Sequence, residues 1–165
     1  MFVGVYVDDV IIISDHEEEI CSLKTYLNDH FKIKDLGKLS YFLGIEIIYE
    51  NRVILTQCKY AKDLVQEYIV EHLHTAICPL ETHVKIMSDE GIELEEQLKF
   101  GRLLRKLNFL LTHTRPDIYF SVQYLSQFIN KPTNVHIKAA IGVLSYINET
   151  LTQGIFFNSR LEFTL

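Results

Sequence analysis

The first thirteen residues form an apolar run that two carboxylates interrupt. Residues 2–13 are mostly β-branched or aromatic, and Asp8 and Asp9 lie in the middle of them. This composition is typical of buried strands, whereas adjacent like charges repel each other and resist desolvation. We therefore expect two strands joined by a turn that brings Asp8 and Asp9 to an exposed hairpin tip.

Two further segments have the pattern of strands. Residues 31–37 alternate between apolar and polar side chains and predict a short strand that ends at a glycine turn. Residues 39–49 predict a longer strand, which the polar turn 50–52 joins to a partner strand at 53–56. Gly44 lies inside the longer strand, where a glycine indicates a bulge or the close approach of another backbone.

Most of the other segments have a helical period. Apolar residues three and four positions apart predict helices near residues 16–30, 57–70, 95–113, 114 onward and 133–150. A final short strand is expected at 155–157. The polar segment 75–94 contains Pro79 and Gly91 and predicts a linker. The pattern thus predicts an α+β chain with a strand-containing lobe at 1–74, the linker at 75–94 and a helical lobe at 95–165.

Composition excludes several classes of protein. The 165 residues are 48% hydrophobic, as in a globular protein and unlike a disordered one. The sequence contains neither a signal-peptide pattern nor an apolar run long enough for a membrane helix, so we expect no membrane partner. Three scattered cysteines, Cys21, Cys58 and Cys78, fit reduced thiols inside a cell.

The charge is distributed unevenly along the chain. The net charge is -6, but residues 1–94 hold 8 basic and 17 acidic side chains, whereas residues 95–165 hold 8 and 5. An acidic half with a carboxylate site and a basic half would suit a polymerase-like division of labour, although ordinary scatter produces the same pattern.

The Asp8–Asp9 pair has two interpretations. Carboxylate oxygens are the ligands that Mg²⁺ prefers, and a bound cation would offset the repulsion between the two side chains. Alternatively, the pair belongs only to the turn, because aspartate is common in tight turns.

Two other groups of residues have a possible binding role. Lys99, Arg102, Arg105 and Lys106 give one predicted helix a basic face, which suits either nucleic acid or simple solvation. His72, His74, Cys78 and His83 are of types that bind zinc, but their spacing fits no standard zinc site.

A series of short motifs occurs in order along nearly the whole chain. It resembles the reverse transcriptases of copia-type LTR retrotransposons. Each motif alone is weak, but the ordered series is specific. The motifs are Tyr6-Val7-Asp8-Asp9, Lys34-Asp35-Leu36-Gly37, Tyr41-Phe42-Leu43-Gly44-Ile45-Glu46, Leu55-Thr56-Gln57, Lys59-Tyr60-Ala61, Thr114-Arg115-Pro116-Asp117-Ile118, Leu125-Ser126-Gln127-Phe128, Pro132, His136 and Ala139.

The resemblance implies a fold and a reaction. The fold would be a partial palm, with both hairpins in one antiparallel sheet backed by helices, followed by a helical lobe like the thumb or connection. The full-length enzyme would be an RNA-directed DNA polymerase that uses two Mg²⁺ ions for nucleotidyl transfer. Asp8 would be the principal metal ligand and catalytic residue of the pair, and Asp9 would assist.

The resemblance also implies contacts with a primer–template of RNA or DNA. Tyr6 would lie near the primer terminus, and Leu43 and Gly44 match the primer grip. The helices after residue 95 would follow the duplex through phosphate contacts, with Arg102, Arg105 and Lys106 as the candidate side chains.

The family's other parts are expected partners. Fingers and a palm strand with another catalytic aspartate precede this motif in the family, and ribonuclease H follows the thumb. Met1 is five residues before Tyr6, so we expect a truncated chain that binds Mg²⁺ weakly or not at all and is inactive alone. It would be intracellular, in cytoplasmic virus-like particles or the nucleus, and not secreted. The alternative is a non-catalytic nucleic-acid-binding or structural remnant of a decayed element.

Overall fold

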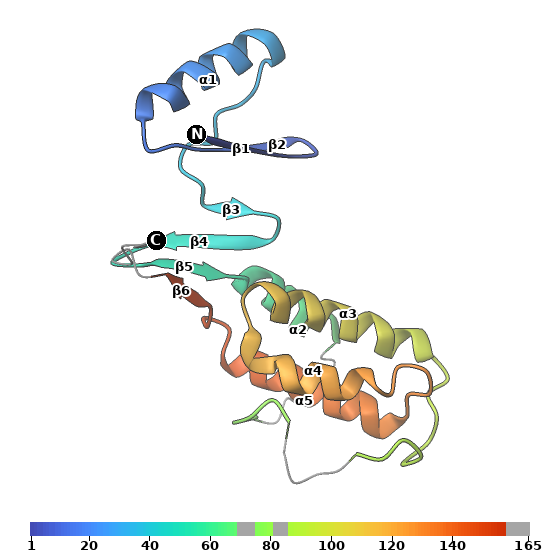
Figure 1. Cartoon of the computed structure of the whole chain (residues 1–165). Coiled ribbons are helices and arrows are strands. Elements are labelled where there is room, and N and C mark those ends of the chain that lie inside the picture. Colours follow the sequence, from blue (N-terminus) through green and yellow to red (C-terminus); the bar gives the residue numbers. More distant parts are fainter. Residues whose placement is uncertain (69–74, 81–85, 158–165) are drawn as a thin grey trace, which may run out of the picture. The chain divides into compact units, whose positions relative to one another are not determined.

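The computed structural model describes residues 1–68, 75–80 and 86–157 (Figure 1). Its helices and antiparallel sheets confirm the predicted α+β class. The chain forms two compact units, Met1–Ser40 and Tyr41–Leu165. This division differs from the predicted lobes, since the 39–56 hairpin shares a unit with the helices that follow it. A functional boundary at 75–94 stays a prediction.

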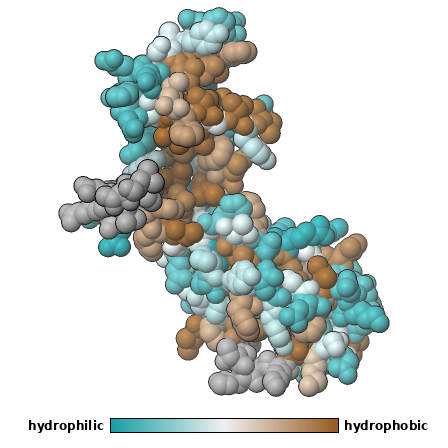
Figure 2. Space-filling model, in the orientation of Figure 1, coloured by the Kyte–Doolittle hydropathy of each residue, from teal (hydrophilic) through white to brown (hydrophobic). Residues whose placement is uncertain are grey.

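The first unit contains a hairpin and one helix. Strand β1 (Phe2–Tyr6) pairs with β2 (Asp9–Ile13) in an antiparallel register that places Tyr6 opposite Asp9. Every residue from 1 to 10 is exposed, including Phe2 at 78% and Val5 at 71%. Figure 2 shows the apolar surface that results over this unit. The strands form as predicted, but the burial that their composition indicates is not found within the described residues.

Helix α1 (Glu17–Phe31) begins with three glutamates, which the helix dipole stabilises. It ends where Lys32 adopts a left-handed conformation with φ 50° and donates its backbone N–H to the Asn28 carbonyl. The strand predicted at 31–37 is wrong. Asp35 accepts hydrogen bonds from the Gly37 N–H and the Lys24 ammonium, and these local bonds favour a turn over sheet pairing.

The second unit contains an antiparallel sheet of order β3–β4–β5–β6. Its strands are β3 (Tyr41–Phe42), β4 (Ile45–Tyr49), β5 (Val53–Thr56) and β6 (Ile155–Phe157). The single strand predicted at 39–49 is wrong, because a two-residue turn at Leu43 and Gly44 divides it. Gly44 therefore marks a turn, not a bulge. The expectation of one palm sheet is also wrong, since β1–β2 forms a separate two-stranded sheet in the described chain.

The core of the second unit is helical. Helices α2 (Cys58–Tyr68), α3 (Gln97–His113), α4 (Tyr119–Ser126) and α5 (Asn134–Glu149) surround it, and the 3₁₀ turn η1 (Pro116–Ile118) leads into α4. Helix α2 packs against α5 through the face that its periodicity predicted, with Ala61, Leu64 and Val65 buried. It thus belongs to the helical core, whereas a helix backing the hairpin sheet was expected. Residues 69–74, the end of that predicted helix, lie outside the described residues.

The second half of the predicted linker packs on this core. Ile86 is 5% exposed, and its carbonyl accepts a hydrogen bond from the Tyr124 hydroxyl at 3.0 Å. The backbone of Ile92 exchanges hydrogen bonds with Asn134, through the side-chain oxygen and the backbone N–H. Residues 86–94 are therefore fastened to the N-terminal end of α5.

Among the described residues, no helix combines the length and the apolar character that a membrane crossing requires.

Candidate functional site

The Asp pair lies at the tip of the β1–β2 hairpin. Val7 and Asp8 form the turn, and Asp9 is the first residue of β2. Tyr6, Asp8 and Asp9 are all exposed, so the predicted exposed tip is confirmed. Val7 has φ 49°, a left-handed conformation that a β-branched residue rarely adopts. A strained residue at a tip that carries two carboxylates is a common feature of functional turns.

The tip suits a hard cation in part. Two adjacent carboxylates offer oxygen ligands of the kind that Mg²⁺ prefers, but octahedral Mg²⁺ needs six oxygens. The described residues hold no group of three or more His, Cys, Asp or Glu side chains placed to share a metal ion. The tip alone could therefore supply only part of a coordination shell, and the rest would come from water, substrate or other carboxylates.

A second candidate element is the turn between β3 and β4. Leu43 has φ 48° and Gly44 has φ 82°, so both central residues have the positive φ of a type I′ hairpin turn. Glycine adopts this conformation without penalty, whereas leucine is strained there. Leu43 is 41% exposed at this turn. The predicted close approach at Gly44 is made by a side chain, the ring of Phe109 from α3.

The basic residues lie on α3 with unequal freedom. Arg102 and Arg105 are exposed, and the Arg105 Nε donates to the Gly101 carbonyl at 3.3 Å. Lys106 is half-buried, forms an ion pair with Glu67 and lies over the Tyr68 ring, 5.6 Å from its centroid. The hydrogen bond to Glu67 raises the pKa of Lys106. A nucleic acid would have to compete with Glu67 for Lys106, so Arg102 and Arg105 are the more available cations.

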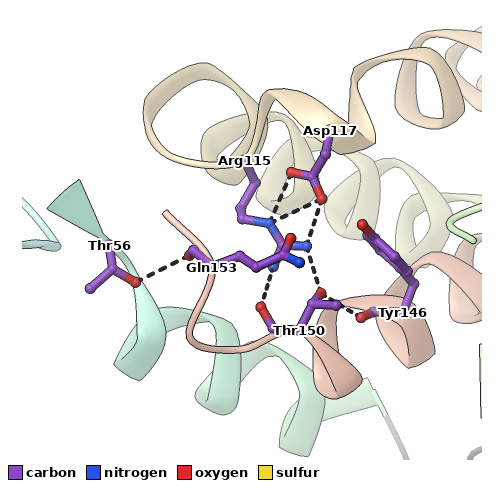
Figure 3. A network of polar contacts seen from close by, with 6 residues as sticks. All are labelled: Thr56, Arg115, Asp117, Tyr146, Thr150 and Gln153. Atoms are coloured by element: carbon purple, nitrogen blue, oxygen red, sulfur yellow. Dashed lines mark hydrogen bonds and ion pairs between the residues drawn. The ribbon is translucent and has the colours of Figure 1, made fainter. Parts of the chain in front are cut away.

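Figure 3 shows a buried arginine to which the sequence assigned no role. Arg115 is 2% exposed, and its Nε and Nη2 donate to the two oxygens of Asp117, at 3.0 and 2.8 Å. Its Nη1 and Nη2 also donate to the backbone carbonyl and the hydroxyl of Thr150, at the end of α5. Thr114-Arg115-Pro116-Asp117 stood among the recurring motifs, and arginine and aspartate two positions apart were the available signal.

Asp117 and Tyr146 show the electrostatic effect of this network. Burial raises the pKa of Asp117, but the hydrogen bonds and charge of Arg115 and the Tyr146 hydroxyl outweigh it and hold that pKa below its ordinary value. Burial, together with the nearby carboxylate, raises the pKa of Tyr146. Asp117 is therefore a fixed anion that compensates the buried guanidinium, as a structural ion pair requires.

The structure groups the predicted site residues into two sets. Tyr6, Asp8 and Asp9 belong to the unit Met1–Ser40. The unit Tyr41–Leu165 contains the β3–β4 turn and the basic residues of α3. Of the zinc-type residues, His72, His74 and His83 lie outside the described residues, and Cys78 is exposed.

Comparison with known proteins identifies the family. Residues 1–82 match the family described as "Reverse transcriptase (RNA-dependent DNA polymerase)". The chain is 31% identical over 157 residues to the retrovirus-related Pol polyprotein from transposon RE1 of Arabidopsis thaliana, which covers 94% of this chain. It therefore belongs to the copia-type retrotransposon reverse transcriptases, as its motifs predicted.

Two further relatives support the same assignment. The Pol polyprotein from transposon TNT 1-94 of Nicotiana tabacum is 28% identical over 154 residues, or 88% of this chain and 12% of the polyprotein. A putative transposon Ty5-1 protein of Saccharomyces cerevisiae is 25% identical over 167 residues, or 100% of this chain and 54% of that protein. The chain spans about 11% of the RE1 polyprotein. No solved structure matches the chain significantly.

Proposed function

We propose that this chain forms part of the palm and the thumb of an RNA-directed DNA polymerase. The observation that carries the proposal is the exposed Asp8–Asp9 pair at the tip of an apolar hairpin, inside a segment that matches the reverse transcriptase family. The apolar residues on both faces of β1–β2 support it further, because such a sheet is normally covered on both sides by a larger domain.

In the complete enzyme, Asp8 and Asp9 hold Mg²⁺ by their carboxylate oxygens. The ions, when bound, supply charge neutralisation for nucleotidyl transfer. Tyr6 lies opposite Asp9 in the hairpin and contacts the primer terminus next to the metal ligands. The exposed tip gives both carboxylates access to a triphosphate, which a buried strand would not.

The second unit contacts the primer–template in this proposal. The β3–β4 turn presents the backbone of Leu43 and Gly44 to the primer strand, because glycine allows a sugar–phosphate chain to approach closely. Arg102, Arg105 and Lys106 supply phosphate contacts from α3, which fix the position of the duplex without reading its sequence. The remainder of the polyprotein supplies the other parts of the polymerase.

Metal binding at the tip can be tested in the 165-residue chain. Paramagnetic Mn²⁺, used in place of Mg²⁺, should broaden the amide signals of residues 6–10 before all others. Asp8→Asn/Asp9→Asn should remove this effect. Glu17→Gln/Glu18→Gln is the matched control, since it removes the same charge from an exposed acidic pair in the same unit. Equal broadening in the Asp8→Asn/Asp9→Asn variant would contradict the metal-site proposal.

The nucleic-acid contacts can be tested by salt titration. A labelled RNA–DNA hybrid should bind with an affinity that falls steeply with salt, and Arg102→Ala/Arg105→Ala should lower the slope by about one to two phosphate contacts. Lys138→Ala, which removes a cation from α5, is the control and should leave the slope unchanged. Equal slopes for wild type and the double variant would remove α3 from the interface.

A further inference from the structure

Phe109 forms a direct contact between α3 and the β3–β4 turn. A Cβ atom built on Gly44 would lie 3.6 Å from Cε1 of Phe109, so the ring packs on the backbone of the turn at van der Waals distance. The ring is half-buried and belongs to the same compact unit as the turn. The position of the turn is therefore fixed by a helix more than fifty residues away in the sequence.

Two aromatic neighbours hold the Phe109 ring in place. Tyr60 from α2 meets it edge-on, with ring centroids 5.1 Å apart, and His113 lies one helical turn further along α3 at 4.5 Å. The His113 ring is itself fixed, because its Nδ1 lies 2.7 Å from the Phe109 carbonyl oxygen. A ring clamped on two sides has little rotational freedom, which suits a rigid support for a turn.

Phe109 also shares a face of α3 with two of the basic residues. Positions 102, 106 and 109 are four and three residues apart and lie along one stripe of the helix. At 1.5 Å of rise per residue, Arg102 is about 10 Å from Phe109 along the axis. The ring that supports the turn and the cations of the stripe are thus parts of one rigid element.

We propose that Phe109 is a positioning residue, which holds the Leu43–Gly44 turn in register with Arg102 and Lys106 so that both contact the same nucleic-acid strand. This inference rests on the proposed function for the nucleic-acid contact, but the support of the turn by Phe109 is independent of it. The ring also helps to keep Leu43 in its strained conformation, because the surrounding packing must outweigh the cost of a positive φ.

The support of the turn is tested without nucleic acid. Amide hydrogen exchange across residues 41–46 should speed up about tenfold in Phe109→Ala, while exchange at residues 53–55 of β5 changes less than about twofold. Phe109→Tyr keeps the ring and should behave as wild type. Phe120→Ala removes an exposed aromatic residue from α4 and is the matched control. If exchange at 41–46 does not change, or if it rises equally throughout the sheet, the positioning role is overturned.

The nucleic-acid part is tested with a labelled RNA–DNA hybrid. Phe109→Ala should weaken binding about fivefold, and Phe109→Tyr should restore it. Gly44→Ala strains the turn at φ 82°, so Phe109→Ala should weaken binding by less than about twofold more in that background. Full additivity would show that Phe109 does not act through the turn and would overturn the proposal.

The two readouts separate the possible failures. If the wild type binds no hybrid, the proposed nucleic-acid function of this unit fails and its shared-strand contact fails with it, while the exchange data still decide whether Phe109 supports the turn. If the wild type binds and Phe109→Ala binds equally well, only the positioning role fails.

Discussion

Two non-glycine residues with a left-handed backbone occupy the tips of the two hairpins. Val7 has φ 49° beside Asp8, and Leu43 has φ 48° beside Gly44. Each such residue costs about 1–3 kcal/mol, and asparagine or glycine would adopt the same backbone more easily. Both residues lie in motifs to which the family resemblance assigns a function. We infer that these tips are not optimised for stability alone.

Leu43→Asn should stabilise the chain. Asparagine followed by glycine is a preferred pair in type I′ turns, so the strain of Leu43 is relieved, and we expect a gain of about 0.5–1 kcal/mol in the free energy of unfolding. Urea denaturation measures this gain. Leu43→Ala is the control, because alanine removes the same side chain but keeps the conformational penalty. A Leu43→Asn variant no more stable than Leu43→Ala would refute the prediction.

The Asp pair should not stabilise the fold in the absence of metal. Its carboxylates are exposed and carry adjacent like charges, so Asp8→Asn/Asp9→Asn should leave the thermal midpoint in metal-free buffer unchanged or raise it. Asp35→Ala is the contrasting control. It removes the acceptor of the Lys24 and Gly37 hydrogen bonds and should lower the midpoint. A clear drop in the double variant would mean that these carboxylates have structural partners.

At the scale of elements, the Arg115 network joins the start of α4 to the end of α5. The guanidinium reaches Asp117 in η1 and Thr150 after α5, and Thr56 of β5 donates to the Gln153 carbonyl just beyond. The segment that leads into β6 is thus held at two points (Figure 3). A buried arginine with several hydrogen bonds is costly to disrupt, because its charge would be left without a partner.

The stability of this network should depend on pH. The pKa of Asp117 in the folded chain is below the ordinary value of 3.8, so its contribution is present above pH 3.8 and is lost as the pH falls through the folded value. Asp117→Asn should therefore cost about 1 kcal/mol at pH 6, with allowance for partial exposure, and progressively less below pH 3.8. Urea titrations at several pH values measure the difference.

The control for this prediction is Asp63→Asn, at an exposed position of α2. It should show no such convergence with the wild type in acid. An Asp117→Asn penalty that stays constant from pH 6 to the acid limit would mean that the carboxylate charge is not what stabilises the Arg115 network.

Residues with a strong local signal could be predicted, and residues whose role depends on tertiary contacts could not. The Asp8–Asp9 tip follows from two charges inside an apolar run, and the buried face of α2 follows from its period. The break at Leu43 could not be foreseen, since leucine disfavours the conformation it adopts. Arg115 and Phe109 act through partners 35 and more residues away, so nothing near them in the sequence reveals their contacts.

At the scale of the whole molecule, the candidate site is divided between two compact units. The carboxylates belong to Met1–Ser40, and the turn and the basic helix belong to Tyr41–Leu165. In the proposed function a bound primer–template would contact both units. Catalysis would therefore depend on how the rest of the polyprotein holds the two units together.

The 165-residue chain alone should not extend a primer. Two-metal transfer needs several carboxylates around the ions, and the described residues bring no group of three metal-binding side chains together. Loss of such a ligand sacrifices several kcal/mol of charge stabilisation at the reacting phosphate. Extension assays with Mg²⁺ or Mn²⁺ on RNA and DNA templates should match an Asp8→Asn control. Extension that depends on Asp8 would contradict this and imply a ligand from a second chain.

The pairing of β6 with β5 has a consequence for synthesis on the ribosome. Residues 155–157 complete a sheet whose neighbouring strand, residues 53–55, emerges about a hundred residues earlier. Until then β5 has an open edge that can pair with another nascent chain. The helices between the two strands can form first from local contacts, and the sheet closes last. A ribosome that stalls before residue 155 would release a chain with a formed helical core and an aggregation-prone strand edge.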